Sequence, residues 1–124
     1  MEAHHAVVWI DHKDAHLFRF TSDDVEKVDL HAHKHQYKNL NREHGSLPED
    51  TKFLRQVVDA LQGAERVLVV GPSRGKLQLL RFMHEHSPEM EHRVVGVETV
   101  DHPTDNQLVA YARAYFKHSD RMTG

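Results

Sequence analysis

The sequence predicts one mixed α/β domain. Short β-rich runs come first, and β-rich runs then alternate with helical patterns of apolar residues. Hydrophobic residues make up 39% of the 124 residues, which is enough for one core. Neither an internal repeat nor a low-complexity linker divides the chain, so residues 1–124 are expected to form a single domain with an ordered core at about 6–117.

Three strands are expected at the start of the chain. Ala6–Asp11 and Ala15–Phe20 are β-rich, and the three residues between them have the length of a hairpin turn. Leu17 and Phe18 fall on opposite faces of the second run, so this strand should be covered on both sides or twisted near an edge of the sheet. With Val25–His33 as the third strand, the region predicts an antiparallel meander.

The rest of the chain alternates helices with strands. After a long loop at His33–Glu49, a helix begins at Pro48 and ends at Gly63, and Arg66–Val70 is a buried strand. A helix with apolar residues from Leu77 to Met83 follows and ends by Pro88.

The last two elements are a strand at Arg93–Val100 and a helix at Pro103–Phe116. Thr104 and Gln107 have the spacing of a capping box. The complete order predicts a ribonuclease H-like mixed five-stranded sheet, with three antiparallel strands plus two crossover strands, flanked by three helices.

Composition limits the classes of function. The formal net charge is −3, although 13 histidines would reverse the sign when protonated, and no cysteine is present to hold a metal or act as a nucleophile. No apolar run is long enough to span a membrane, and the N-terminal residues lack a secretory signal pattern. We therefore expect a cytoplasmic protein with no membrane partner.

The stretch VVGPSRGKLQLL, residues 69–80, joins a strand to a helix through a glycine turn. It is not a nucleotide-binding P-loop, because three residues rather than four separate Gly71 from Gly75 and Leu77 follows Lys76. Two interpretations remain. The glycines simply turn the chain, or Arg74 and Lys76 add a modest anion site at the helix N-terminus.

Histidines alternate at His31, His33 and His35, so on an extended strand the three imidazoles would share one face and could reach one metal ion. This stretch contains no carboxylate to orient them, and neighbouring cations oppose a bound metal ion. A solvated basic loop is the competing interpretation.

The histidine-rich loop, or carboxylates at strand ends, raise the alternative of a metal-dependent hydrolase or nuclease. Asp11 ends the first strand, and Asp14, Glu98, Asp101 and Asp105 are further candidates for a magnesium site. Asp101 and Asp105 equally suit a turn and a helix start.

Aromatic residues divide into two groups. Trp9, Tyr111 and Tyr115 lie at strand or helical spacing and are expected to pack in the core, together with Leu108. Tyr37, between basic residues of the long loop, could instead stack on an RNA base or anchor the loop locally.

Three segments carry a resemblance to a known family: AVVWIDHKDAHLFRF, VLVVGPSRGKLQLLRFM and RVVGVETVDHPTDNQLVAYARAYF. They resemble the middle domain of the archaeal and eukaryotic peptide-chain release factors and Pelota. They resemble more closely the short bacterial translational machinery proteins related to that domain. The resemblance covers about residues 6–117 and implies a ribonuclease H-like fold without nuclease activity.

In release factors the long loop of this domain carries a Gly-Gly-Gln tripeptide. Here the loop reads HAHKHQYKNLNREHG, and no glycine pair precedes Gln36. Glycines allow backbone conformations and close approaches that other residues do not. Peptide release is therefore not expected, and no catalytic residue is carried over.

The resulting hypothesis is a non-enzymatic protein without a cofactor that binds ribosomal RNA or tRNA, including on stalled or resting ribosomes, and does not bind DNA. A protein-interaction module is a further alternative, and homodimerisation is left open. The expected RNA-binding residues are His31, His33, Lys34, His35, Gln36, Tyr37, Lys38, Arg42, Arg74 and Lys76.

Overall fold

The computed structural model describes residues 4–32 and 48–123. Within these ranges the elements are β1 (His5–Ile10), β2 (Asp14–Phe20), β3 (Val25–His31), α1 (Pro48–Ala60), β4 (Arg66–Gly71), α2 (Gly75–His86), α3 (Pro88–Glu91), β5 (Val94–Thr99) and α4 (Asp105–Thr123). No helix in this part of the chain combines the length and apolarity that crossing a membrane requires.

The five strands form one open sheet in the order β3-β2-β1-β4-β5. Short turns join β1 to β2 and β2 to β3, and these pairs are antiparallel. Helical crossovers lead into β4 and β5, so β1 pairs with β4 and β4 with β5 in parallel. The mixed sheet of the predicted fold class is confirmed.

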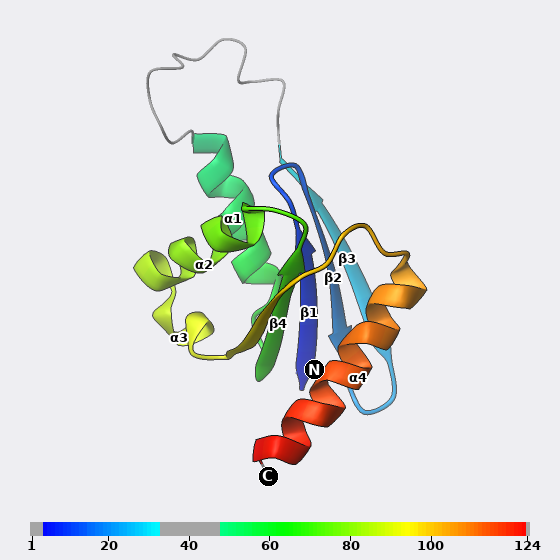
Figure 1. The fold of residues 1–124 in the computed structure, drawn as a ribbon. Coiled ribbons are helices and arrows are strands. Elements are labelled where there is room, and N and C mark those ends of the chain that lie inside the picture. Colours follow the sequence, from blue (N-terminus) through cyan, green and yellow to red (C-terminus); the bar gives the residue numbers. More distant parts are fainter. Residues whose placement is uncertain (1–3, 33–47, 124) are drawn as a thin grey trace.

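Helices cover both faces of the sheet (Figure 1). On one face, α1, α2 and α3 pack over a core that includes Val8, Ile10 and Leu17. On the other face, α4 packs over Val7 and Phe18. Leu17 and Phe18 are neighbours on β2, so this strand is covered on both sides, as its sequence pattern predicts.

Two expectations need correction in the described residues. The third strand ends at His31 rather than His33. Four helices flank the sheet rather than three, because Pro88 begins the short helix α3 instead of only ending α2. Met90, 1% exposed, anchors α3 in the core. A four-residue helix with one buried side chain has too short an apolar pattern to stand out in a sequence.

The aromatic predictions are confirmed in part. Trp9 is 4% exposed and Leu108 is buried beside it, while Tyr115 packs against the same core. Tyr111 is 39% exposed, so its assignment to the core is wrong. The buried stripe of α4 runs through Leu108, Ala112 and Phe116, which leaves Tyr111 beside the stripe rather than on it.

Three hydrogen bonds hold the start of α4. The main-chain N–H of Gln107 donates to Thr104 Oγ1 at 3.1 Å, and the N–H of Thr104 donates to Gln107 Oε1 at 2.9 Å. The predicted capping box is thus confirmed. The Lys27 ammonium on β3 donates to the Asp105 carboxylate, which raises the pKa of Lys27 above its ordinary value. This contact ties the helix to the edge strand.

Candidate nucleic-acid interface

The candidate interface lies at the edge of the sheet where the parallel strands β1, β4 and β5 end. Asp14 at the start of β2 pairs with His31 at the end of β3, so the antiparallel strands place the end of β3 at the same edge. Figure 1 shows that α1 and α2 also begin here. Ala32 and Pro48, the described residues on either side of 33–47, therefore both lie at this edge. Crevices at the carboxyl ends of parallel strands are the usual ligand sites of open α/β sheets.

Close backbone approaches at this edge explain the glycines of the β4–α2 turn. A Cβ on Gly71 would lie 2.2 Å from the carbonyl oxygen of Ile10, and one on Gly75 would lie 2.8 Å from Cα of Asp11. Both glycines therefore let the turn pass over the end of β1. The N–H of Val100 donates to the Gly71 carbonyl at 3.0 Å, which joins the β5–α4 loop to the turn.

The same turn presents two cations. Arg74 is exposed, takes an αR conformation before the first residue of α2 and forms no side-chain cap. Lys76 Nζ donates to the main-chain oxygen of Ser73 at 2.8 Å. Within the described ranges, neither side chain makes an ion pair with a carboxylate. Both positive charges consequently remain available to an anion outside the protein.

His31 is the one member of the expected loop site, apart from Arg74 and Lys76, that falls in the described residues. Its Nδ1 lies 2.6 Å from Asp14 Oδ1, and the imidazole is 68% exposed. The remaining expected RNA-binding residues lie outside the described residues: His33, Lys34, His35, Gln36, Tyr37, Lys38 and Arg42.

No group of three or more potential ligands that could hold a metal ion occurs in residues 4–32 and 48–123. His33 and His35 lie outside these ranges, so the predicted sharing of a metal by three alternating histidines stays untested. The structure does bring a carboxylate to this histidine stretch, which has none in its own sequence. Asp14, from the neighbouring strand, is a carboxylate in contact with the imidazole of His31.

Most of the strand-end carboxylates are occupied by local contacts. Asp11 Oδ1 accepts hydrogen bonds from the N–H groups of Lys13 and Asp14 and thereby closes the β1–β2 turn. Asp101 Oδ1 lies 2.9 Å from His102 Nδ1. As described above, Asp14 contacts His31 and Asp105 contacts Lys27. Four of the five carboxylates expected at a magnesium site, all except Glu98 on β5, thus serve turns, a helix start and histidine pairs.

A polar cluster near this edge is the feature that the sequence reasoning missed. Trp9 Nε1 donates to the carbonyl oxygen of Asp101 at 2.6 Å. The indole stacks on His16 with ring centroids 5.4 Å apart, and the His102 ring lies tilted 5.0 Å away. His16 Nδ1 in turn lies 2.7 Å from Asp29 Oδ1. The cluster fixes the β5–α4 loop on the sheet.

A signal for part of this cluster exists in the sequence. DAH at residues 14–16 and DLH at residues 29–31 repeat one pattern on two adjacent strands. When such strands pair antiparallel, each aspartate faces the other strand's histidine, as the observed register shows. The hydrogen bond between Trp9 and Asp101 joins positions 92 residues apart and has no comparable signal.

Comparison with solved structures now identifies the fold. Archaeoglobus fulgidus Pelota superposes with a TM-score of 0.63 and 16% identity over 92% of this chain. The chain is similar in fold to Pelota. An archaeal translation termination factor gives a TM-score of 0.59 and 10% identity over 97% of the chain. The Saccharomyces cerevisiae protein Dom34 gives 0.53 and 12% identity over 77%.

The matched region is a minority of each of these proteins. The chain spans 32% of the Archaeoglobus Pelota, 42% of the archaeal termination factor and 29% of the yeast protein. At these identities the similarity establishes a shared fold, which agrees with the expected likeness to one domain of the release factors and Pelota. No protein-family model matches the sequence, and no curated protein matches it significantly.

Proposed function

We propose that this chain is a non-enzymatic, translation-associated domain that binds ribosomal RNA or tRNA through the carboxyl edge of its sheet. The proposed setting is the cytoplasm, with stalled or resting ribosomes included. Peptide release is not part of the proposal, because the segment between β3 and α1 has no glycine pair before Gln36.

The fold supports the link to translation. Among the proteins that share it, one is described as a translation termination factor and another as a termination-like factor involved in RNA quality control pathways. This chain corresponds to one part of such proteins. The ribosomal partner is therefore proposed for this part alone, and the activities of the remaining parts are not transferred.

The arrangement of positive charge is the observation that carries the RNA-binding proposal. Arg74 and Lys76 lie at the edge where β3 ends and α1 begins, and neither is neutralised by a carboxylate of the described residues. The sequence that connects β3 to α1 adds Lys34, Lys38 and Arg42. The connecting segment carries these three cations against one carboxylate, Glu43, and Arg74 and Lys76 add two cations that make no ion pair in the described residues. Such cations can contact phosphates, which dominate affinity for nucleic acid.

We propose no enzymatic role because most of the candidate carboxylates make local contacts instead of converging on one site. Asp11 accepts two main-chain hydrogen bonds, and Asp14 and Asp101 contact histidines. Carboxylates that hold two magnesium ions must instead converge on a shared open position. No contact in the described residues therefore favours a nuclease site built from these carboxylates.

Co-sedimentation with ribosomes and titration of single-stranded RNA test the proposal. The variant K34A/K38A/R42A should bind both partners more weakly than the wild type. The control R55A/R81A removes cations from exposed positions on α1 and α2 and should retain binding, and circular dichroism should show that both variants fold. Equal loss in the two variants, or no binding by the wild type, would contradict the proposal. Self-association of a protein that binds no RNA would favour an interaction module.

A further inference from the structure

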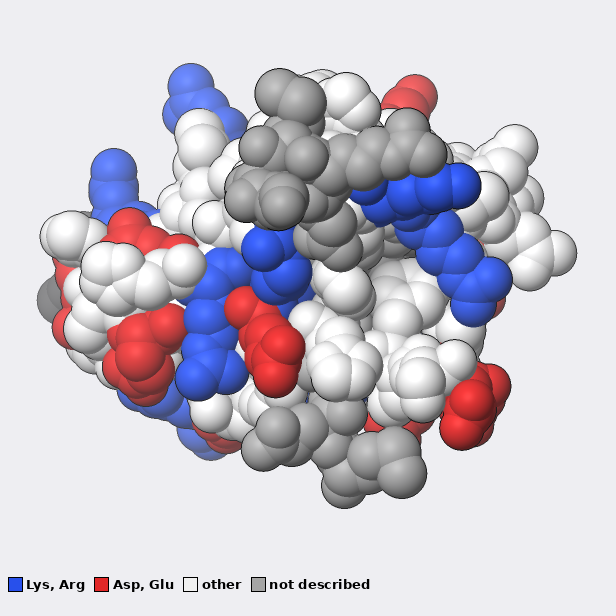
Figure 2. Space-filling model, turned by 90° about the horizontal axis from the view of Figure 1, so that it is seen from below, with Lys and Arg blue, Asp and Glu red and all other residues white. Residues whose placement is uncertain are grey.

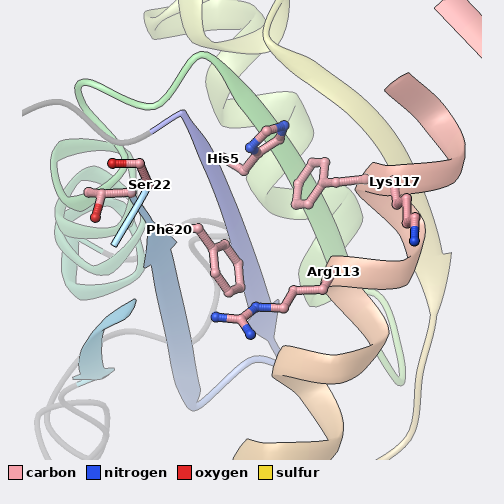
Figure 3. Close-up of a pocket in the computed structure, with 7 residues that line it drawn as sticks. His5, Phe20, Ser22, Arg113 and Lys117 are labelled. Carbon is pink, nitrogen blue, oxygen red and sulfur yellow. The ribbon is translucent and has the colours of Figure 1, made fainter. Parts of the chain in front are cut away.

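A second concave site lies at the opposite edge of the sheet from the candidate interface. Its volume is about 420 Å³. His5 at the start of β1 and Phe20 at the end of β2 are register partners and form part of its wall. Figure 3 shows side chains from β1, β2, the β2–β3 turn and α4 around this cavity. The lining residues are His5, Phe20, Thr21, Ser22, Arg113, Phe116 and Lys117.

Helix α4 forms one wall of the cavity with side chains at helical spacing. Arg113, Phe116 and Lys117 are spaced by three and four residues, so they lie on one side of the helix. The guanidinium carbon of Arg113 lies 5.6 Å from the centroid of the Phe20 ring, a cation–π arrangement that holds the head group at the cavity. The His5 ring packs on Phe116 with centroids 4.4 Å apart.

The opposite wall is the turn between β2 and β3. The N–H of Asp24 donates to Thr21 Oγ1 at 3.1 Å, and the N–H of Thr21 donates to the Asp24 carbonyl at 3.0 Å. These bonds close the turn and leave Ser22 exposed at its tip, with its hydroxyl available at the cavity rim. The cavity therefore has two cations on one side and a hydroxyl on the other, as Figure 3 shows.

The two cations of this site are not engaged by the nearby carboxylates of Asp23 and Asp24, which follow Ser22 in the turn. Neither Arg113 nor Lys117 makes an ion pair with another described residue, and none of the lining residues is acidic. Figure 2 looks onto this edge of the molecule and shows an uncharged surface with Lys and Arg side chains on two sides and Asp or Glu side chains also at its border. In a chain of net charge −3, two adjacent cations that make no ion pair in the described residues favour an anion supplied from outside.

We propose that this cavity binds a phosphate group carried by a small ligand of mononucleotide size. A guanidinium offers paired N–H donors that match two phosphate oxygens, and the lysine adds a compact charge. Ser22 can donate a further hydrogen bond. The volume falls in the range of about 300–1,000 Å³ typical of small-ligand sites. A phosphodiester of RNA presents similar chemistry, so the experiment separates the two sources.

Isothermal titration of the full chain with adenosine monophosphate, inorganic phosphate and adenosine tests this site. Adenosine monophosphate should bind, inorganic phosphate should bind more weakly, and adenosine should bind weakest. R113Q/K117Q should lower the affinity for adenosine monophosphate at least about tenfold, because two charge-assisted contacts are lost. The control K52Q/R81Q removes the same charge from α1 and α2, on the other face of the sheet, and should keep the wild-type affinity.

Two results would overturn the proposal. One is the absence of binding by any phosphate probe at millimolar concentration, and the other is equal affinity in the wild type and a folded R113Q/K117Q. If this variant loses affinity for an RNA oligonucleotide but not for adenosine monophosphate, the site belongs to the RNA backbone and the small-ligand proposal fails. The site lies at the opposite edge of the sheet from the proposed RNA interface, so K34A/K38A/R42A should bind adenosine monophosphate like the wild type.

Discussion

Gly75, the first residue of α2, lies directly against the main chain of Asp11 at the end of β1. The position that a Cβ would occupy on Gly75 is 2.8 Å from Asp11 Cα and 2.7 Å from its carbonyl carbon. Main-chain atoms at the end of a central strand have little room to move aside. This contact sets where α2 begins and places Arg74 and Lys76 at the carboxyl edge of the sheet.

The substitution Gly75→Ala should therefore destabilise the fold by about 1–3 kcal/mol, the usual cost of forcing extra volume into a packed site. Urea unfolding followed by circular dichroism measures the difference. Ser73→Ala, in the same turn but exposed, should change stability by less than about 0.5 kcal/mol. Equal midpoints for the two variants would show that the turn does not pass over β1 as described.

Trp9 should be difficult to replace even by another aromatic residue. Trp9→Phe keeps most of the apolar surface but removes the donor to the Asp101 carbonyl and leaves space beside His16 and His102. We expect a loss of about 1–3 kcal/mol. The far-ultraviolet circular dichroism signal measures it, because the variant lacks the single tryptophan that reports by fluorescence. A loss under about 0.5 kcal/mol would contradict the packing of the loop on this ring.

The capping box of α4 provides a prediction with a conservative control. Thr104→Ala removes the acceptor of the Gln107 N–H and should cost about 0.5–2 kcal/mol of stability. Thr104→Ser retains a hydroxyl and should restore most of that loss. If the alanine and serine variants melt at the same temperature, the hydroxyl does not cap the helix.

Asp29 gives a prediction for pH. The pKa of Asp29 is lowered from its ordinary value of 3.8, first by the hydrogen bond with His16 and then by the charge of Lys27, which also contacts Asp105. A carboxylate whose pKa is lowered in the folded state stabilises the fold fully when the pH is above its pKa in the unfolded state. This contribution is lost as the pH falls through the lower folded value.

Asp29→Asn should therefore destabilise the protein at pH 7 by no more than about 1 kcal/mol, because the pair is partly exposed and screened by solvent. The deficit should shrink as the pH falls below 3.8 and the wild-type carboxylate takes up a proton. Chemical unfolding at pH 7, 4 and 2.5 measures it. A deficit that does not change with pH would mean that the charge of Asp29 plays no part.

Much of the fold could be predicted from the sequence because its signals are local. Alternating and continuous apolar runs defined the strands, and the spacing of Thr104 and Gln107 defined the start of a helix. Short turns then required antiparallel neighbours, and helical connections required parallel ones. The sequence did not reveal α3, since a single turn anchored by Met90 has too few residues to show a period.

The contacts of the candidate site were less predictable because they join distant parts of the chain. Gly75 could be assigned to a turn from its neighbours, yet its approach to Asp11 depends on how β4 pairs with β1. The partner of His31 depends on the register of two strands. The cavity beside Arg113 and Lys117 combines β1, β2, a turn and α4, so no single segment carries its pattern.

The most direct test of the central claim is the salt dependence of RNA binding, measured as log K against log salt concentration for the wild type and for K34A/K38A/R42A. Each phosphate contact to single-stranded RNA contributes about 0.7 to the slope. We predict that the wild type shows a steep decline and that the variant loses about 2 from the magnitude of its slope. Parallel lines for the two proteins, or binding by the wild type that does not vary with salt, would contradict the account.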